Sequence, residues 1–198
     1  MTNEISSGLL LRARLFEALA EDEEFIMQVV KAVSLIKGSI EDGGKVLTFG
    51  NGGSALQAAH ITVELEGRFK RDRRPIPAMC LNTDIAKLTA FSNDFGYSSV
   101  FVRQMEAHCK KEDVAIGLTT SDAMENNDHS RNILEAFRVA RSKGARSIGF
   151  FSIKTLNLLQ WVDVPIIVPN SGVDLIQEVH DSVIHMMCEI VEDGLCAN

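Results

Sequence analysis

The chain has 198 residues, 45% hydrophobic and 24% charged, with a formal net charge of -7, which is typical of one soluble globular domain. An acidic chain repels nucleic-acid phosphates, and no apolar run approaches the roughly 20 residues that span a bilayer, so we expect neither a nucleic acid nor a membrane as partner. The four cysteines form no C-x-x-C pair and the first residues lack the basic start of a signal peptide, so we expect a cytoplasmic location.

The first elements in chain order are helical. Residues 1–42 carry apolar side chains at helical spacing, and because a parallel sheet requires no such arm, we expect it to pack against other subunits. A strand is expected at 46–49, followed by a glycine-rich turn and an amphipathic helix that ends near Leu65. The basic run that follows contains Arg68, Lys70, Arg71, Arg73 and Arg74, and apart from Arg68 we expect it to form a solvated loop rather than a nucleic-acid contact.

Further apolar runs indicate four more strands, at 76–81, 114–118, 147–151 and 164–169. Helical patterns separate most of them, as at 132–143, and a long helix is expected at 173–192. Short apolar strands that alternate with helices predict a parallel sheet covered on both faces. We therefore expect one α/β domain over 1–198, a three-layer sandwich around a five-stranded parallel sheet, with an N-terminal helical arm (1–42) and a core (43–198).

Polar segments follow the predicted strands at the edge where open parallel sheets bind ligands. One of them, Gly50–Ser54, leads from a strand directly into a helix. Glycine permits close backbone approach, and a helix N-terminus favours an anion, so this turn either binds a phosphate or is only capped by Ser54. The hydroxyl cluster Thr119, Thr120 and Ser121 allows the same two interpretations, and neither loop carries a lysine.

Two helices carry the candidate chemical groups. His60 and Glu64 are four residues apart with Arg68 four further on, so all three are expected on one helix face. Gln177 and His185 are expected on one face of the last helix. A His/Glu pair that faces a Gln/His pair can transfer protons or bind a divalent metal such as zinc; an exposed polar face is the simpler alternative.

Two other residue groups accompany these helices. His180 is expected to point away from His185, because helical residues advance by roughly 100°. Asn93 and Asp94 end another predicted helix and add a carboxylate, or form only a helix-terminal turn.

In this order and at this spacing, these motifs resemble the phosphoheptose isomerases, which have the sugar isomerase (SIS) fold, a flavodoxin-like sheet. The motifs are Gly50–Ser54, His60-x-x-x-Glu64-x-x-x-Arg68, Asn93–Tyr97, and Ile176–His180 with His185 beyond, and the resemblance covers nearly the whole chain. It implies an isomerase that converts D-sedoheptulose 7-phosphate to D-glycero-D-manno-heptose 7-phosphate through an enediol, for bacterial lipopolysaccharide or capsule. It also implies a homotetramer with sites at subunit interfaces, where the two helices would come from adjoining subunits.

The resemblance further implies roles for individual residues. Glu64 and His185 would transfer protons, and a metal ion, usually zinc, would be held by His60, Glu64, Gln177 and His185. The positions implied to contact the substrate are Asn51, Gly52, Gly53, Ser54, Glu64, Arg68, Asn93, Asp94, Thr119, Thr120, Ser121, Ser130 and Gln177.

The chain departs from the family pattern after Ser121, where a short insertion brings Asp122, Glu125 and Asp128 near the expected phosphate site, and Ser130 would replace a family serine. Two alternatives stay open. One is a non-catalytic relative, such as an adaptor of the bacterial replication initiator or a sugar-phosphate sensor; Glu64 argues against it, because such adaptors tend to lose this residue. The other is an isomerase of ketohexose 6-phosphates. A nucleotide-binding protein is not expected, since neither nucleotide fingerprint occurs.

Overall fold

The computed structural model describes residues 1–123 and 128–196. Its strands form one parallel sheet in the order β2-β1-β3-β4-β5. Their bounds are Val46–Gly50 (β1), Ala78–Cys80 (β2), Val114–Leu118 (β3), Arg146–Ser152 (β4) and Val164–Val168 (β5). The five expected strands and their parallel pairing are therefore confirmed.

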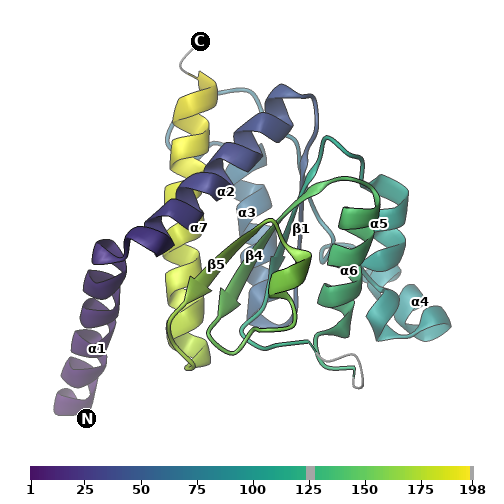
Figure 1. Ribbon diagram of the computed structural model, residues 1–198. Coiled ribbons are helices and arrows are strands. Elements are labelled where there is room, and N and C mark those ends of the chain that lie inside the picture. Colours follow the sequence, from purple (N-terminus) through teal and green to yellow (C-terminus); the bar gives the residue numbers. More distant parts are fainter. Residues whose placement is uncertain (124–127, 197–198) are drawn as a thin grey trace.

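Helices cover both faces of this sheet (Figure 1). One layer contains α2 (Glu23–Glu41), α3 (Gly53–Glu66) and α7 (Val173–Cys196). The other contains α4 (Ile85–Phe95), α5 (Val102–His108) and α6 (Arg131–Ser142), with the short 3-10 helices Tyr97–Ser99 and Leu159–Trp161 in its connections. This confirms the three-layer sandwich. None of the described helices combines the length and hydropathy that crossing a membrane requires.

The side chains of each strand divide the core into two parts. In β1, Val46 packs in the cluster under α2, α3 and α7, whereas Leu47 and Phe49 pack with residues of α5 and α6. Successive strand residues point to opposite faces, so a strand covered on both faces must be apolar along its whole length. All residues of β1 and β3 are buried, which explains the continuous apolar runs in the sequence.

The N-terminal arm is smaller than expected. Only α1 (Thr2–Glu21) extends from the body (Figure 1); α2 packs on the sheet and buries Phe25, Val33 and Ile36 in the core. Arg12 ties α1 to the start of α7 through an ion pair with Glu178 at 2.7 Å. The large apolar side chains that α1 leaves exposed are Ile5, Leu9, Leu10, Leu11 and Phe16. A helix with an uncovered apolar face is typical of a contact surface, and its subunit role stays a prediction.

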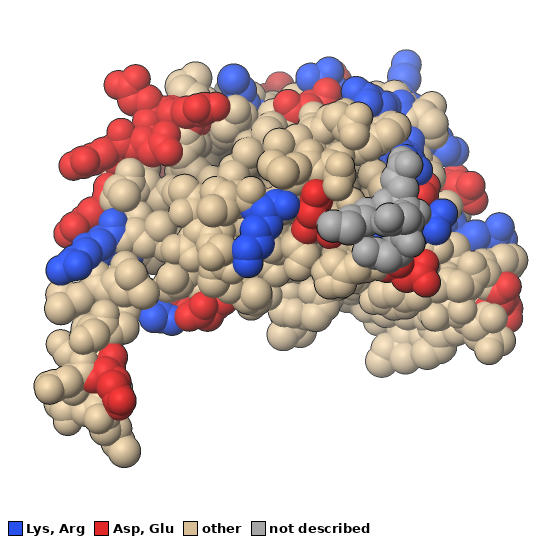
Figure 2. All heavy atoms as spheres, turned by 60° about the horizontal axis from the view of Figure 1, so that its bottom comes forward, with Lys and Arg blue, Asp and Glu red and all other residues tan. Residues whose placement is uncertain are grey.

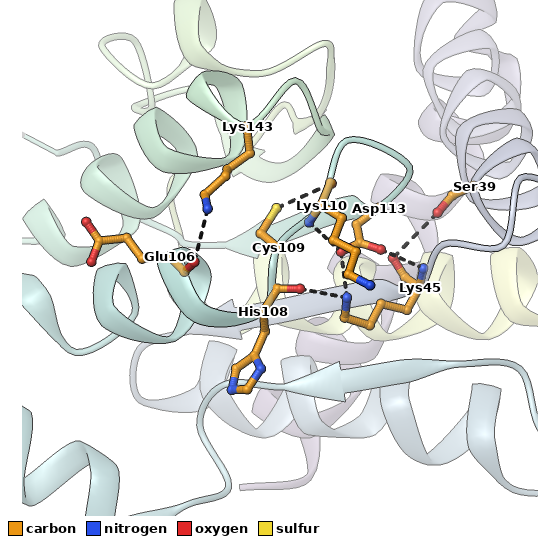
Figure 3. A network of polar contacts seen from close by, with 8 residues as sticks. All are labelled: Ser39, Lys45, Glu106, His108, Cys109, Lys110, Asp113 and Lys143. Atoms are coloured by element: carbon orange, nitrogen blue, oxygen red, sulfur yellow. Dashed lines mark hydrogen bonds and ion pairs between the residues drawn. The ribbon is translucent and has the colours of Figure 1, made fainter.

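A buried ion pair joins the amino-terminal ends of β1 and β3 (Figure 3). Asp113, whose side chain is 1% exposed, accepts hydrogen bonds from Lys45 Nζ at 2.6 Å, from the Lys45 N–H at 2.9 Å and from the Lys110 N–H at 2.8 Å. Lys45 Nζ also donates to the His108 carbonyl. This network lies at the sheet edge opposite the polar loops, so we assign it a structural role.

Candidate functional site

The turn between β1 and α3 has the geometry of an anion site. Gly52 adopts φ 57° and ψ -124°, a conformation that residues with side chains rarely reach, and α3 begins directly after it. No side chain of the described residues caps this helix end, so its positive end is available to an anion. Ser54 is the second residue of α3 and 2% exposed, so the interpretation of Ser54 as the helix cap was wrong.

Amide side chains connect this turn to neighbouring loops. Asn51 and Asn132 exchange two hydrogen bonds of 2.9 and 2.8 Å, and the Tyr97 hydroxyl donates to Asn51 Oδ1 at 3.0 Å. Asn82 bonds to both the N–H and the carbonyl of Gly50. The sequence interpretation gave no individual site role to Asn132, Tyr97 or Asn82, although Tyr97 ends the Asn93–Tyr97 motif and Asn82 lies in a polar segment that follows a predicted strand.

The hydroxyl loop after β3 is only partly available to a ligand. Thr119 Oγ1 donates to the Ser121 carbonyl at 2.9 Å and accepts from the Ser121 N–H at 3.1 Å, so it shapes the turn. Thr120 and Ser121 are half-buried, and no hydrogen bond within the described residues engages their hydroxyls. Ser130 is buried at the start of α6 in the left-handed conformation, with φ 54° and ψ 14°. These three residues remain candidate phosphate donors.

The acidic insertion is described only in part. The carboxylate of Asp122 accepts hydrogen bonds from the N–H and the side-chain amide of Asn157, at 2.9 to 3.0 Å. Asp128 is exposed, and Glu125 lies outside the described residues. Because Asn157 supplies donors to Asp122, at least this charge is compensated, by the loop that follows β4.

The central feature is a cluster formed by α3 and α7. His60 Nε2 lies 3.0 Å from Glu64 Oε1 and 3.3 Å from His185 Nε2. One possible ligand atom from each residue lies within 4.8 Å of the others. The expected meeting of these side chains is therefore confirmed, but the expectation that the two helices come from adjoining subunits was wrong, because both belong to one chain.

The donor set of this cluster fits a zinc ion. Zinc bonds to imidazole and carboxylate are about 2.0 to 2.2 Å long, which separates tetrahedral donors by roughly 3.3 Å. His60 Nε2 meets both its neighbours at close to this spacing. One nitrogen cannot share a single proton equally with two acceptors, whereas a cation satisfies all three groups. Burial, together with the charge of Glu64, raises the pKa of the nearby Cys188 thiol to about 12, and Cys188 is not part of the group of possible ligands.

Gln177 lies between the cluster and the glycine-rich turn. Its side-chain amide packs over Gly53, where an added Cβ would collide with it, and its backbone carbonyl accepts a hydrogen bond from Gln57 Nε2 at 2.7 Å. Gly53, Gln57, His60, Gln177 and Asp181 are among the residues that line an open hollow of about 350 Å³. Gly53 of the glycine-rich turn and His60 of the cluster therefore border the same hollow.

Three residues that were expected in the site lie away from the cluster of His60, Glu64 and His185. Arg68 does not share the face of His60 and Glu64, because α3 ends at Glu66 and the backbone of Gly67 is extended; that expectation was wrong. Asn93 and Asp94 are exposed on α4, on the other side of the sheet, and hydrogen-bond to each other at 3.0 Å.

Phe69 is a site residue that the sequence interpretation missed. Its ring stacks on that of His185 with centroids 5.7 Å apart and planes 9° apart. The ring of His60 meets His185 edge-on, at 4.8 Å and 84°. The imidazole of His185 is therefore held by ring contacts with both Phe69 and His60.

His180 is fully buried on the opposite side of α7, as predicted, and lies 3.3 Å from the Phe151 carbonyl. Burial lowers its pKa to about 4. At a pH below about 6.5, the pKa of His180 in the unfolded chain, the unfolded chain binds a proton that the folded chain does not bind. The free energy of unfolding must therefore fall as the pH drops toward 4. This lowering of the His180 pKa corresponds to a loss of about 3 kcal/mol in the free energy of unfolding.

We therefore expect His180→Gln to flatten the pH dependence of stability between pH 6.5 and 4 relative to the unaltered protein. Urea unfolding at several pH values in this window measures the difference between the two slopes. Parallel slopes would show that His180 does not titrate on unfolding.

Comparison with known proteins finds similarity along nearly the whole chain. A family model described as SIS domain matches residues 12–152. The phosphoheptose isomerase of Aquifex aeolicus is 43% identical over 178 residues, 90% of each chain, and that of Pelobacter propionicus is 38% identical over 100% of both chains. The solved structure of a phosphoheptose isomerase from Francisella tularensis is similar with a TM-score of 0.88 and 29% identity, over 97% of this chain and 98% of that one.

Proposed function

Because the chain belongs to the phosphoheptose isomerases of the SIS domain family, we propose that it converts D-sedoheptulose 7-phosphate to D-glycero-D-manno-heptose 7-phosphate. The observation that carries this proposal is the cluster of His60, Glu64 and His185, whose member His60 borders the same hollow as Gly53 at an uncapped helix N-terminus. Interconversion of a ketose and an aldose moves a proton between adjacent carbons, which requires a base and a group that serves the oxygens.

In this proposal the phosphate binds at the N-terminus of α3 and accepts hydrogen bonds from Ser54, Thr120, Ser121 and Ser130. Figure 2 looks onto the end of the molecule where the strands end, and the middle of this face is mostly uncharged. Neutral donors and the helix dipole would therefore supply most of the binding. From Gly53 to His60, α3 rises about 10.5 Å, a span that suits an extended seven-carbon sugar phosphate.

The proposed chemistry proceeds through an enediol. Glu64 removes a proton from C1 of the ketose while O2 gains a proton; Glu64 then returns a proton to C2 while O1 loses one, which leaves the aldose. A carboxylate suits removal of a proton next to a carbonyl, and an imidazole beside it, here His185, can exchange protons with the two oxygens.

We propose that His60, Glu64 and His185 hold a zinc ion, with Gln177 as a further ligand from the same hollow. When bound, zinc would supply a Lewis acid that polarises the substrate carbonyl. His185 is thus proposed both as ligand and as proton-transfer group. A His185→Ala variant that loses turnover but keeps its zinc would favour proton transfer, and one that loses both would favour ligation.

We further propose a cytoplasmic homotetramer with sites at subunit interfaces, in bacterial heptose synthesis for surface polysaccharide. On α3, Leu56 and Val63 are 75% and 63% exposed beside the cluster, and α1 is uncovered, which supports a subunit contact there. Arg68, Asn93 and Asp94 would then act in a neighbouring subunit's site. Light scattering of the purified protein should give the molar mass of four chains. The molar mass of a single chain would contradict the proposed tetramer.

The substrate is tested by comparing zinc-loaded protein on sedoheptulose 7-phosphate and fructose 6-phosphate. We expect kcat/KM to favour the seven-carbon sugar about 10-fold or more, because the shorter sugar cannot reach both ends of the hollow. Equal or faster turnover of the six-carbon sugar would favour the ketohexose alternative. Turnover of neither sugar, together with tight binding of a protein partner, would favour the adaptor.

A further inference from the structure

The loop between α3 and β2 contains a buried ion pair that the proposed reaction does not use. Arg73 Nε lies 3.0 Å from Glu192 Oε1, and the two side chains are 5% and 0% exposed. The expectation of a solvated basic loop was therefore right for Lys70, Arg71 and Arg74, which are exposed, and wrong for Arg73. A buried charge is unfavourable unless it is fully paired, so Arg73 and Glu192 must stay in contact and hold the loop in place.

Arg73 closes the end of the helix that carries Glu64. The last four carbonyls of a helix lack partners within it. Arg73 Nη2 donates to the carbonyl of Glu64 at 2.8 Å, and Nη1 donates to that of Leu65 at 2.7 Å. Arg73 is therefore bonded directly to the backbone of the proposed base.

Glu192 holds the same loop to α7. Its carboxylate accepts hydrogen bonds from the N–H groups of Lys70 and Arg71, at 2.8 and 3.2 Å, in addition to Arg73. Burial raises the pKa of Glu192, but these hydrogen bonds and the Arg73 charge outweigh it, and the net pKa lies below the ordinary value. Glu192 follows His185 by seven residues, or two helical turns, so both lie on one face of α7.

Phe69 extends this connection to the second proposed proton-transfer group. It directly precedes Lys70, whose N–H is bonded to Glu192, and its ring stacks on His185. One ion pair thus fixes the backbone of Glu64 on α3 and the ring that packs on His185 of α7.

We propose that Arg73 and Glu192 are positioning residues, which set the spacing between Glu64 and His185 by locking the end of α3 and the loop with Phe69 onto α7. The inference rests on the proposed function for its kinetic consequences. Its structural basis is independent of the substrate, because the same spacing sets the affinity of the cluster for zinc.

The test compares Arg73→Lys and Glu192→Gln with two matched controls. Lysine keeps the charge of Arg73 but cannot bond to two carbonyls and Glu192 together, and glutamine keeps the size of Glu192 without its charge. Arg71→Lys and Asp193→Asn serve as controls, because this neighbouring pair joins the same loop and helix at 2.7 Å but is about half exposed. Zinc affinity is measured by competition with a chromophoric chelator, and kcat and KM with sedoheptulose 7-phosphate.

We expect both test variants to lose about 10- to 100-fold in zinc affinity and in kcat, as for outer contacts of a metal site, with KM nearly unchanged. The controls should match the unaltered protein. Phe69→Leu, which leaves the ion pair intact, should lower kcat several-fold and shift its pH profile, and it tests the proposal if the other variants do not fold.

Test variants that match their controls in zinc affinity and kcat would overturn the proposal. So would Phe69→Leu with the kcat and pH profile of the unaltered protein. If the unaltered protein fails to turn over the sugar, the proposed function fails, while the chelator competition still decides whether Arg73 and Glu192 position the cluster.

Discussion

Replacing Glu64 with Gln is expected to lower kcat for sedoheptulose 7-phosphate by about 10³-fold or more, with the fold intact. Glutamine matches the size of the carboxylate but cannot accept the proton from carbon. The Glu64 side chain is 16% exposed, and glutamine keeps an oxygen that can contact His60, so the change should cost little stability. Steady-state kinetics and thermal unfolding on the same preparation measure both effects.

The control for this substitution is Glu66→Gln, which removes a carboxylate from the exposed last turn of the same helix and should leave kcat unchanged. Zinc content must be measured alongside, because Glu64 is also a proposed ligand. Restoration of kcat to near its normal value by excess zinc would assign Glu64 to ligation alone and remove it from the proton path.

Replacing Asp113 with Ala is expected to lower the free energy of unfolding by about 3 kcal/mol or more. The substitution leaves the Lys45 ammonium and two backbone N–H groups without the acceptor that holds β1 beside β3 (Figure 3). Breaking one side of a buried pair costs more than the pair itself contributes, because the remaining charge stays desolvated. Urea unfolding followed by circular dichroism measures the change.

Glu112→Ala is the matched control, since the neighbouring carboxylate pairs with Lys111 at 3.6 Å and the two side chains are 33% and 77% exposed. Exposed pairs contribute little, so we expect a change within about 0.5 kcal/mol. Equal effects of the two substitutions would show that the Asp113 network does not anchor the sheet.

The sheet could be predicted because burial on both faces requires uninterrupted apolar runs, and β3 has the expected bounds. The second strand is shorter than its apolar run because Pro77 has no N–H to donate, so β2 begins only at Ala78. The membership of α2 in the core could not be predicted, because its apolar stripe suits a sheet and a partner subunit equally.

The candidate site, like the fold, could be predicted only in part. The His60 and Glu64 pair was predictable because spacing on a helix is a local property, whereas the Arg68 prediction failed where Gly67 ended the helix. Phe69 and Arg73 act through contacts with residues more than 100 positions away along the chain, which no local pattern encodes.

The most direct test of the central claim, proton transfer by Glu64 at the hollow between α3 and α7, is the reaction run in D₂O and followed by NMR. The zinc-loaded protein should form the aldose with solvent deuterium at C2, and Glu64→Gln should form almost none. Equal rates of aldose formation by the two proteins would contradict the account.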